Sequence, residues 1–233
     1  MKTGLTVIAV GMIAVGLLAV SAGFARGGFH HWSFDVTSEH GSGKLTTEDR
    51  SVPSFTRIES NLGLNLIVHI GEPQKVSLTI DDNLVDNIKT QVHDGVLEIS
   101  SRHSFSTKHD ATVEITMPAI ESVTSNGSGN TEIHDLKGDK FSFDLAGSGN
   151  FSANGTIEQL SIEINGSGSA DTRLLSAKNV DVSISGSGEA TVAAKNSLNV
   201  DISGSGSVSY LGSPEHVHQS ISGSGSVEKM NSI

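Results

Sequence analysis

The tripeptide Gly-Ser-Gly occurs six times between residues 127 and 225, and ISGSG itself occurs three times. Counted from the first glycine, the tripeptides begin at 127, 147, 166, 186, 204 and 223, so the intervals are 20, 19, 20, 18 and 19 residues. A functional loop is needed once in a chain. A spacing this regular instead indicates one structural unit repeated along the sequence.

Apolar residues alternate with polar residues on both sides of each Gly-Ser-Gly. In one repeat, Val180, Val182 and Ile184 precede the glycines, and Ala190 and Val192 follow them. A period of two is typical of a strand with one buried face, so each unit reads as strand, sharp corner, strand. Coils stacked about 4.8 Å apart would align equivalent residues in columns. The sequence therefore predicts an all-β parallel β-helix, a solenoid with coils of about 18–20 residues and a GSG corner in each C-terminal coil.

The glycines of these corners are predicted to be structural. A corner that recurs in every coil requires a positive φ or a close backbone approach, and glycine tolerates both. The serine between each pair of glycines would stack into a ladder of hydroxyl groups. The predicted structural corners are Gly127, Gly129, Gly147, Gly149, Gly166, Gly168, Gly186, Gly188, Gly204, Gly206, Gly223 and Gly225.

The rest of the chain divides into three parts. Residues 1–25 have a positive start, an apolar run and small residues suited to cleavage, which is typical of a secretory signal peptide; the alternative is a retained membrane anchor. Residues 26–52 are rich in glycine, serine, histidine and charge and are expected to form a flexible leader. Residues 53–120 alternate less regularly and are expected to form N-terminal irregular β coils, continuous with the regular repeats of 121–233.

Composition narrows the function classes. The chain has no cysteine, so neither a disulfide nor a lipid-modified cysteine is available. The net charge is -11, and loss of Lys2 with the signal peptide would change it to about -12. Such a charge disfavours nucleic acid and anionic lipid as partners, and no transmembrane segment follows the signal peptide. Envelope or extracellular glycans and proteins remain as partners.

One outward column contains the candidate chemistry. Three residues before each corner stand Thr124, Asp144, Glu163, Ser183, Asp201 and Ser220. Asp144 and Glu163 would lie one coil apart, close to the ~5 Å between the carboxylates of retaining glycosidases. The single Trp32 and an inward-facing Tyr210 leave few aromatic rings to stack on sugars, so we predict no catalytic residue. Ca²⁺ bound by Asp144, Glu163 or Asp201 is an alternative to a simply solvated face, and no cofactor is expected.

The ten histidines offer only pairs of metal ligands. His216 and His218 would point the same way from one strand, and His30 and His31 are adjacent in the leader. Zinc sites usually require three or four protein ligands. His216 and His218 are therefore weak candidates, and scattered surface histidines are the simpler interpretation.

The motifs FTRIESNLGLNLIVHIGEP, TVEITMPAIESVTSNGSG and SVSYLGSPEHVHQSISGSGSV occur in this order. Together with the repeats they resemble the GIN-domain family over residues 52 to 229, a family described as "putative autotransporter adhesin" head domains. The resemblance implies a right-handed parallel β-helix in an exported bacterial protein, located in the periplasm or at the cell surface. It implies no catalytic residues. The function expected is a non-catalytic binding module for glycan or protein; the alternatives are a polysaccharide-active lyase or hydrolase, or an envelope scaffold that binds a protein partner.

Overall fold

The computed structural model describes residues 38–231, nearly all of them in strands, as a β-solenoid. The predicted signal peptide, residues 26–37 of the predicted leader, and His30, His31 and Trp32 lie outside the described residues. No helix among residues 38–231 is long and apolar enough to cross a membrane.

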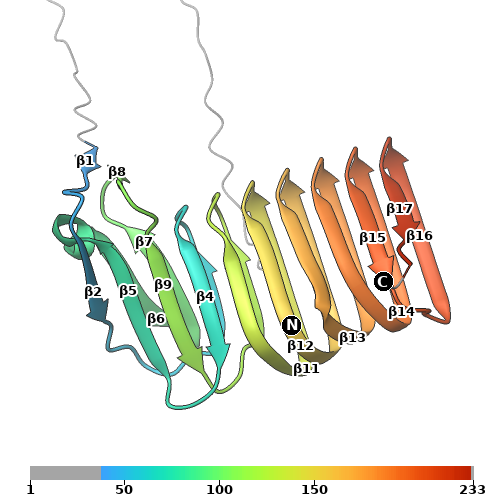
Figure 1. Ribbon diagram of the computed structural model, residues 1–233, viewed down its shortest axis with the longest axis horizontal. Helices are drawn as coiled ribbons and strands as arrows, with labels where there is room; N and C mark the ends of the chain where they lie inside the picture. The colour runs from blue at the N-terminus through green and yellow to red at the C-terminus, as the bar shows by residue number, and fades with distance from the viewer. Residues whose placement is uncertain (1–37, 232–233) are drawn as a thin grey trace, which may run out of the picture. The chain divides into compact units, whose positions relative to one another are not determined.

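The regular coils stack as predicted (Figure 1). Four long strands each cover most of one coil and pair in parallel with the next: β11 (Thr131–Gly147), β12 (Asn150–Gly166), β13 (Ser169–Gly186) and β14 (Glu189–Gly204). The last coil is formed by β15 (Ser207–Leu211) and β16 (His216–Gly223), and β17 (Ser226–Lys229) pairs with β15. The register aligns Phe143, Ile162, Val182 and Val200, so one repeat lies directly over the next.

The core is a column of apolar side chains inside the coils. The alternate residues of each strand are buried, for example Leu160, Ile162 and Ile164 in β12. Near the start of the regular stack the ring of Phe143 stacks on Phe151 with centroids 3.9 Å apart. Because the coils are narrow, small and branched residues fill most of the interior and the largest rings cluster at one level.

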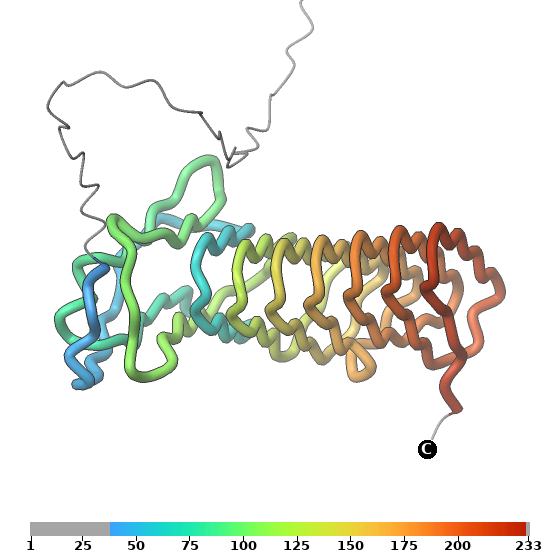
Figure 2. The backbone as a smooth tube through the Cα atoms, turned by 90° about the horizontal axis from the view of Figure 1, so that it is seen from above, coloured from blue at the N-terminus to red at the C-terminus, as the bar shows by residue number. Residues whose placement is uncertain are grey.

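The first coil lies between two later segments (Figure 2). It consists of β3 (Arg57–Ser60), a corner at residues 61–64, and β4 (Asn65–Ile70). On one side it pairs with β10 (Ser122–Ser125) and β11. On the other side it pairs with β7 (Val96–Ser101) and β9 (Thr112–Met117). Residues 71–121 therefore fold back over the N-terminal end before the chain continues into the regular coils.

That end is covered by antiparallel strands, which differs from the irregular coils expected for residues 53–120. Strand β5 (Lys75–Asp81) runs antiparallel to β9, and β6 (Ile88–His93) forms a hairpin with β7. The 3-10 helix η1 (Asp82–Asn87) connects β5 to β6 and buries Leu84 and Val85. Alternating strands can pair in either direction, so the alternation alone did not distinguish these strands from coils.

Part of the expected leader is ordered. Strand β2 (Leu45–Asp49) pairs antiparallel with β5, and β1 (Glu39–His40) pairs with β8 (Phe105–Ser106). The backbone N–H groups of Gly43 and Lys108 donate to the fully buried carboxylate of Asp81. The segment from residue 39 to residue 49 thus belongs to the N-terminal cap, although its composition is that of a loop.

The corners show two separate requirements for glycine. The first glycine of a corner has a positive φ from Gly147 onward, for example +130° at Gly186. The second glycine has no positive φ, but a Cβ on Gly188 would lie 2.6 Å from Ile164 Cγ2 and 3.0 Å from the Gly168 carbonyl oxygen. Both positions therefore exclude larger residues, for different reasons.

The serines between these glycines stack through their backbone. The N–H of Ser167 donates to the Gly147 carbonyl at 3.0 Å, and the N–H of Ser187 donates to the Gly166 carbonyl at 2.9 Å. Their side chains are exposed, and no hydroxyl of the six corner serines has a hydrogen-bond partner within residues 38–231. The ladder expected of the hydroxyl groups is thus a ladder of peptide groups.

Candidate functional site

The predicted outward column is present and is longer than expected. Thr124, Asp144, Glu163, Ser183, Asp201 and Ser220 align one after another across neighbouring strands. Thr124 also pairs with Glu59, and Glu59 pairs with Glu98 of β7, because the inserted first coil continues the same sheet. We call the outer surface of this sheet, over β7, β3, β10, the C-terminal halves of β11–β14 and β16, the carboxylate face.

Asp144 and Glu163 are neighbours on this face. Burial raises the pKa of the Asp144 carboxyl above its ordinary value, and the negative charge of Glu163 raises it further. Glu163 accepts a hydrogen bond from the side-chain amide of Asn165 at 2.8 Å. Neither carboxylate lines the pocket at the first corner or the pockets beside His134, Phe55 and Phe151. The two carboxylates are thus register partners on adjacent strands, outside the pockets at the first corner and along the N-terminal halves of the coils.

Asp201 is separated from that pair. Its neighbours along the column are Ser183 and Ser220, so a hydroxyl stands between it and Glu163. His216 and His218 lie on β16 beside Ser197 and Asn199, and both are exposed. The described part of the chain has no group of three or more histidine or acidic side chains placed to hold a metal ion. Calcium binding by the carboxylates stays an untested alternative to a solvated face.

Amide and hydroxyl groups also lie on the carboxylate face, together with the basic side chains of Arg57 and Lys140. The Asn126 amide donates to Asn61 at 2.8 Å, and the Asn199 amide donates to Asp181 at 2.7 Å. Ser197 donates to Asn179 at 2.8 Å. The large apolar side chains exposed among the described residues are Leu45, Leu174, Val217 and Ile221. Only the last two belong to a strand of this face, and they occupy the inward positions of the final coil.

A histidine pair on another face was missed by the sequence analysis. The rings of His69 and His134 stack with centroids 4.9 Å apart, although 64 residues separate them in the chain. His69 Nε2 lies 3.5 Å from Glu114 Oε1, and His134 Nε2 lies 3.7 Å from Glu132 Oε2. The pair exists because β4 and β11 are adjacent, and that adjacency depends on the position of the inserted first coil.

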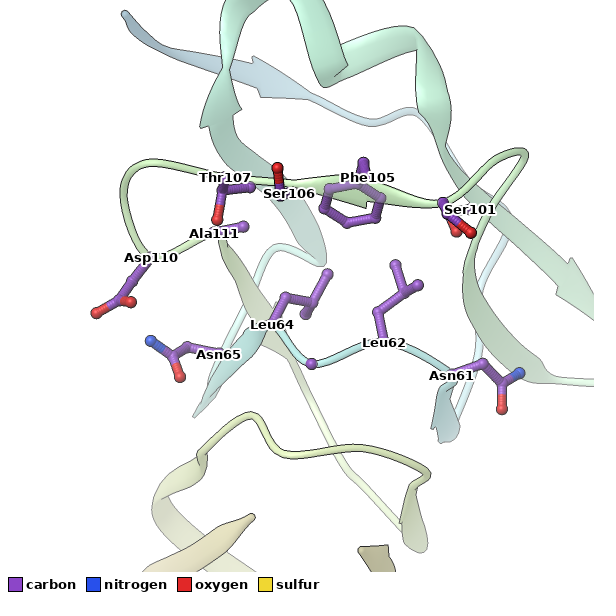
Figure 3. Close-up of a pocket in the computed structure, with 12 residues that line it drawn as sticks. Asn61, Leu62, Leu64, Asn65, Ser101, Phe105, Ser106, Thr107, Asp110 and Ala111 are labelled. Atoms are coloured by element: carbon purple, nitrogen blue, oxygen red, sulfur yellow. The ribbon is translucent and has the colours of Figure 1, made fainter. Parts of the chain in front are cut away.

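A pocket of about 480 Å³ at the first corner was also missed (Figure 3). The corner Leu62–Gly63–Leu64 forms one wall and the loop around Phe105 forms the other. The sequence signals were the absence of Gly-Ser-Gly from NLGLN and the interruption of the alternation by HSFSTKHD. Neither signal indicates that the two segments face each other.

Comparison with solved structures identifies the same fold in proteins from several bacteria. A putative adhesin from Bacteroides fragilis is 22% identical, with a TM-score of 0.65 over 82% of this chain and 99% of that chain. A putative lipid binding protein from Parabacteroides distasonis is 22% identical, with a TM-score of 0.57 over 82% of this chain and 99% of that one. A putative adhesin from Parabacteroides merdae is 20% identical, with a TM-score of 0.54 over 83% of this chain and all of that one. At these identities the likeness shows the fold alone.

No curated protein matches the chain. The family model described as "putative auto-transporter adhesin, head GIN domain" matches residues 54–214, which include the inserted first coil and five of the six Gly-Ser-Gly corners. The match thus spans most of the solenoid and confirms the resemblance inferred from the ordered motifs. The chain belongs to the GIN-domain family of adhesin-like proteins.

Proposed function

We propose that the protein is an exported, non-catalytic binding module of the cell envelope whose carboxylate face binds a glycan. The observation that supports this most is the parallel register, which sets amide, hydroxyl and carboxylate groups in columns on one rigid sheet. Such groups suit a ligand with many hydroxyl groups. Protein interfaces instead have aromatic and apolar residues at their centre, and none is exposed on the middle coils of this face.

The negative charges of the carboxylate face limit the class of glycan that can bind there. Glu59, Glu98, Asp144, Glu163 and Asp201 all belong to the same column. Anionic polysaccharides would be repelled, so a neutral or amino-containing glycan is the preferred ligand. The repeat of one coil every ~4.8 Å also favours an extended polymer over a single small molecule, because weak contacts add along the columns.

The test is co-sedimentation of the purified folded chain with insoluble polysaccharides, namely chitin, cellulose and cell-wall sacculi. The same tubes are assayed for newly formed sugar ends. The double variant Glu163→Gln with Asp201→Asn should lower the apparent affinity about tenfold, because two hydrogen-bond acceptors lose their charge. The matched control is Glu189→Gln with Glu228→Gln, which removes the same charge from exposed strand positions after the corners.

Binding that falls with the first double variant and not with the second supports the proposal. Absence of binding to every polymer would overturn it and favour the protein scaffold. New sugar ends that disappear with Asp144→Asn or Glu163→Gln would overturn the non-catalytic assignment and favour the polysaccharide-active enzyme.

A further inference from the structure

The pocket at the first corner arises from the topology of the inserted coil. In the regular stack each corner is covered by the preceding corner, to which its N–H groups donate. The layer that precedes the first coil has no such corner, because β7 and β9 are joined by a loop over residues 102–111. The N–H of Asn61 donates to Ile99 at 2.9 Å and that of Asn65 donates to Ala111 at 2.8 Å. Between these two bonds the loop leaves the first coil and opens the pocket.

The walls of the pocket are apolar at its centre. Leu64 is 5% exposed, and Leu62 and Phe105 are half-buried against the core. In Figure 3 the side chains of Leu62 and Leu64 and the ring of Phe105 approach one another across the space between the corner and the loop. Phe105 supplies an accessible aromatic surface, although the scarcity of such rings in the sequence had argued against carbohydrate cleavage.

The rim of the pocket is polar and contains free donors. Ser101, Ser104 and Thr107 contribute hydroxyl groups from the loop side. Gly63 is exposed, and its backbone N–H has no hydrogen-bond partner within residues 38–231. The Asn65 side chain accepts a bond from the Asn130 N–H through Oδ1, while its amide nitrogen has no partner among the described residues. A ligand that brings acceptors would satisfy these groups.

Charge excludes one class of ligand. Asp110 is the single ionisable residue that lines the pocket, and no lysine, arginine or histidine side chain lines it. A carboxylate or phosphate would therefore meet a negative charge without a compensating cation.

The loop is held in place before any ligand arrives. The buried Asn87 accepts the N–H of Arg102 at 3.1 Å and of His103 at 2.9 Å, and it donates to the His103 carbonyl at 3.1 Å. Further along, the N–H of Glu39 donates to the Ser104 carbonyl and His40 contacts the Ser106 hydroxyl at 2.7 Å. Because hydrogen bonds already hold this loop in place, the loop would lose little conformational entropy when a ligand binds.

We propose that this pocket binds a neutral N-acetylated sugar residue. The acetamide methyl group would pack between Leu62 and Leu64, its carbonyl oxygen would accept from the Gly63 N–H, and the apolar face of the sugar ring would lie on Phe105. The loop hydroxyls and the Asn65 amide would bond the ring hydroxyls. This inference rests on the proposed glycan function and adds a site for one residue, at the N-terminal end of the carboxylate face.

The probe is free N-acetylglucosamine, observed by saturation-transfer NMR with the folded chain. Glucose, which lacks the acetamide group, and glucuronic acid, which is anionic, should each bind at least tenfold more weakly.

Phe105→Ala should lower the affinity for N-acetylglucosamine about tenfold. Since Phe105 is half-buried, Ser104→Trp serves as a second variant, because Ser104 is exposed and a tryptophan there would fill the pocket. Leu174→Ala, at a side chain 74% exposed and outside the pocket, is the control.

The proposal is supported if N-acetylglucosamine gives a saturation-transfer signal that Phe105→Ala weakens, Ser104→Trp abolishes and Leu174→Ala preserves. The unfolding temperature of Ser104→Trp should then equal that of the parent chain. Three results would overturn the proposal: no saturation-transfer signal from N-acetylglucosamine, a signal that Ser104→Trp leaves unchanged, or an equal signal from glucose. Polysaccharide binding that depends on Glu163 and Asp201 but persists in Ser104→Trp overturns the pocket alone. N-acetylglucosamine bound in the pocket, with no polymer co-sedimenting, overturns the role of the carboxylate face alone.

Discussion

The two glycines of each corner restrict the chain through different physical terms. Gly186 has φ +130°, a region that side chains with a Cβ rarely adopt, and an added Cβ would also overlap the carbonyl oxygen of Gly166. Gly188 lacks the unusual φ and is restricted only by packing, against the Ile164 side chain and the Gly168 carbonyl oxygen. A substitution at the first position therefore strains the backbone, and one at the second must displace a neighbouring coil.

Gly186→Val is expected to destabilise the solenoid. The φ strain alone costs about 1–3 kcal/mol, and the overlap with Gly166 adds to it. Ser187→Ala is the matched control, because the Ser187 hydroxyl is exposed and unbonded, and it should change the free energy of unfolding by less than about 0.5 kcal/mol. Urea unfolding of both variants measures the difference. Equal midpoints for Gly186→Val and the parent chain would rule out a strained corner.

Asp144→Asn should stabilise the protein at neutral pH and not at acidic pH. Burial and Glu163 raise the pKa of Asp144 in the folded state, so the folded chain retains a proton that the unfolded chain has released. Stability therefore falls as the pH rises from the unfolded pKa through the folded pKa. The amide removes this loss, so its unfolding temperature should exceed that of the parent chain at pH 7 and approach it at pH 3.

Asp201→Asn is the control for the loss of one charge on the same face, since its neighbours in the column are Ser183 and Ser220. A lower unfolding temperature for Asp144→Asn at pH 7 would contradict the assigned cause.

At the scale of strands, the predictability of each element follows from how much its sequence repeats. Between Thr131 and Gly204, equal spacing and period-two alternation determine both register and direction, so the columns containing Asp144 and Glu163 followed from the sequence. Val76 and Leu78 alternate in the same way but belong to the antiparallel β5. Alternation identifies a buried face and leaves the pairing partner open, which is why the order of the N-terminal strands did not follow from it.

The pocket shows the same limit for the candidate site. Leu62 and Phe105 come together because the first coil is inserted between two later segments, a long-range pairing without a repeat to reveal it. The loop that carries Phe105 has the polar composition of any surface loop. Its buried anchor, Asn87, lies on a short 3-10 helix between two strands, where a polar residue gives no sign of its role.

Asn87→Leu should destabilise the chain by about 1–3 kcal/mol and loosen the pocket loop. Leucine has a similar volume, but the N–H groups of Arg102 and His103 would lose their acceptor in a site that is 5% exposed at Asn87. Asp86→Leu, at an exposed neighbour on the same 3-10 helix, is the control. Proteolysis under native conditions should cleave residues 101–111 faster in Asn87→Leu than in the control, and equal rates would contradict the anchoring role.

At the scale of the whole solenoid, the two ends differ. The N-terminal end is covered by the antiparallel strands β2, β5 and β6 and by η1, which bury Leu84 and Val85. The C-terminal end has no comparable cover within the described residues: every residue of β16 is exposed, and Val217 and Ile221, at inward positions, are 45% and 41% exposed. Coils contact only their neighbours, so stability should decline toward the uncovered end.

Hydrogen exchange should detect this gradient. A strand within the stack opens only if two interfaces separate, whereas β16 pairs with β14 alone and can open by losing one. Peptides covering residues 216–223 should exchange about 100-fold faster than peptides covering 178–186 of β13, when both are followed by mass spectrometry on the native chain. Ile221→Ser, which removes apolar contact from the last coil alone, should accelerate exchange in β16 and leave β13 unchanged. Equal protection of the two regions would mean that the C-terminal coil opens only with the whole stack, which contradicts a stability built coil by coil.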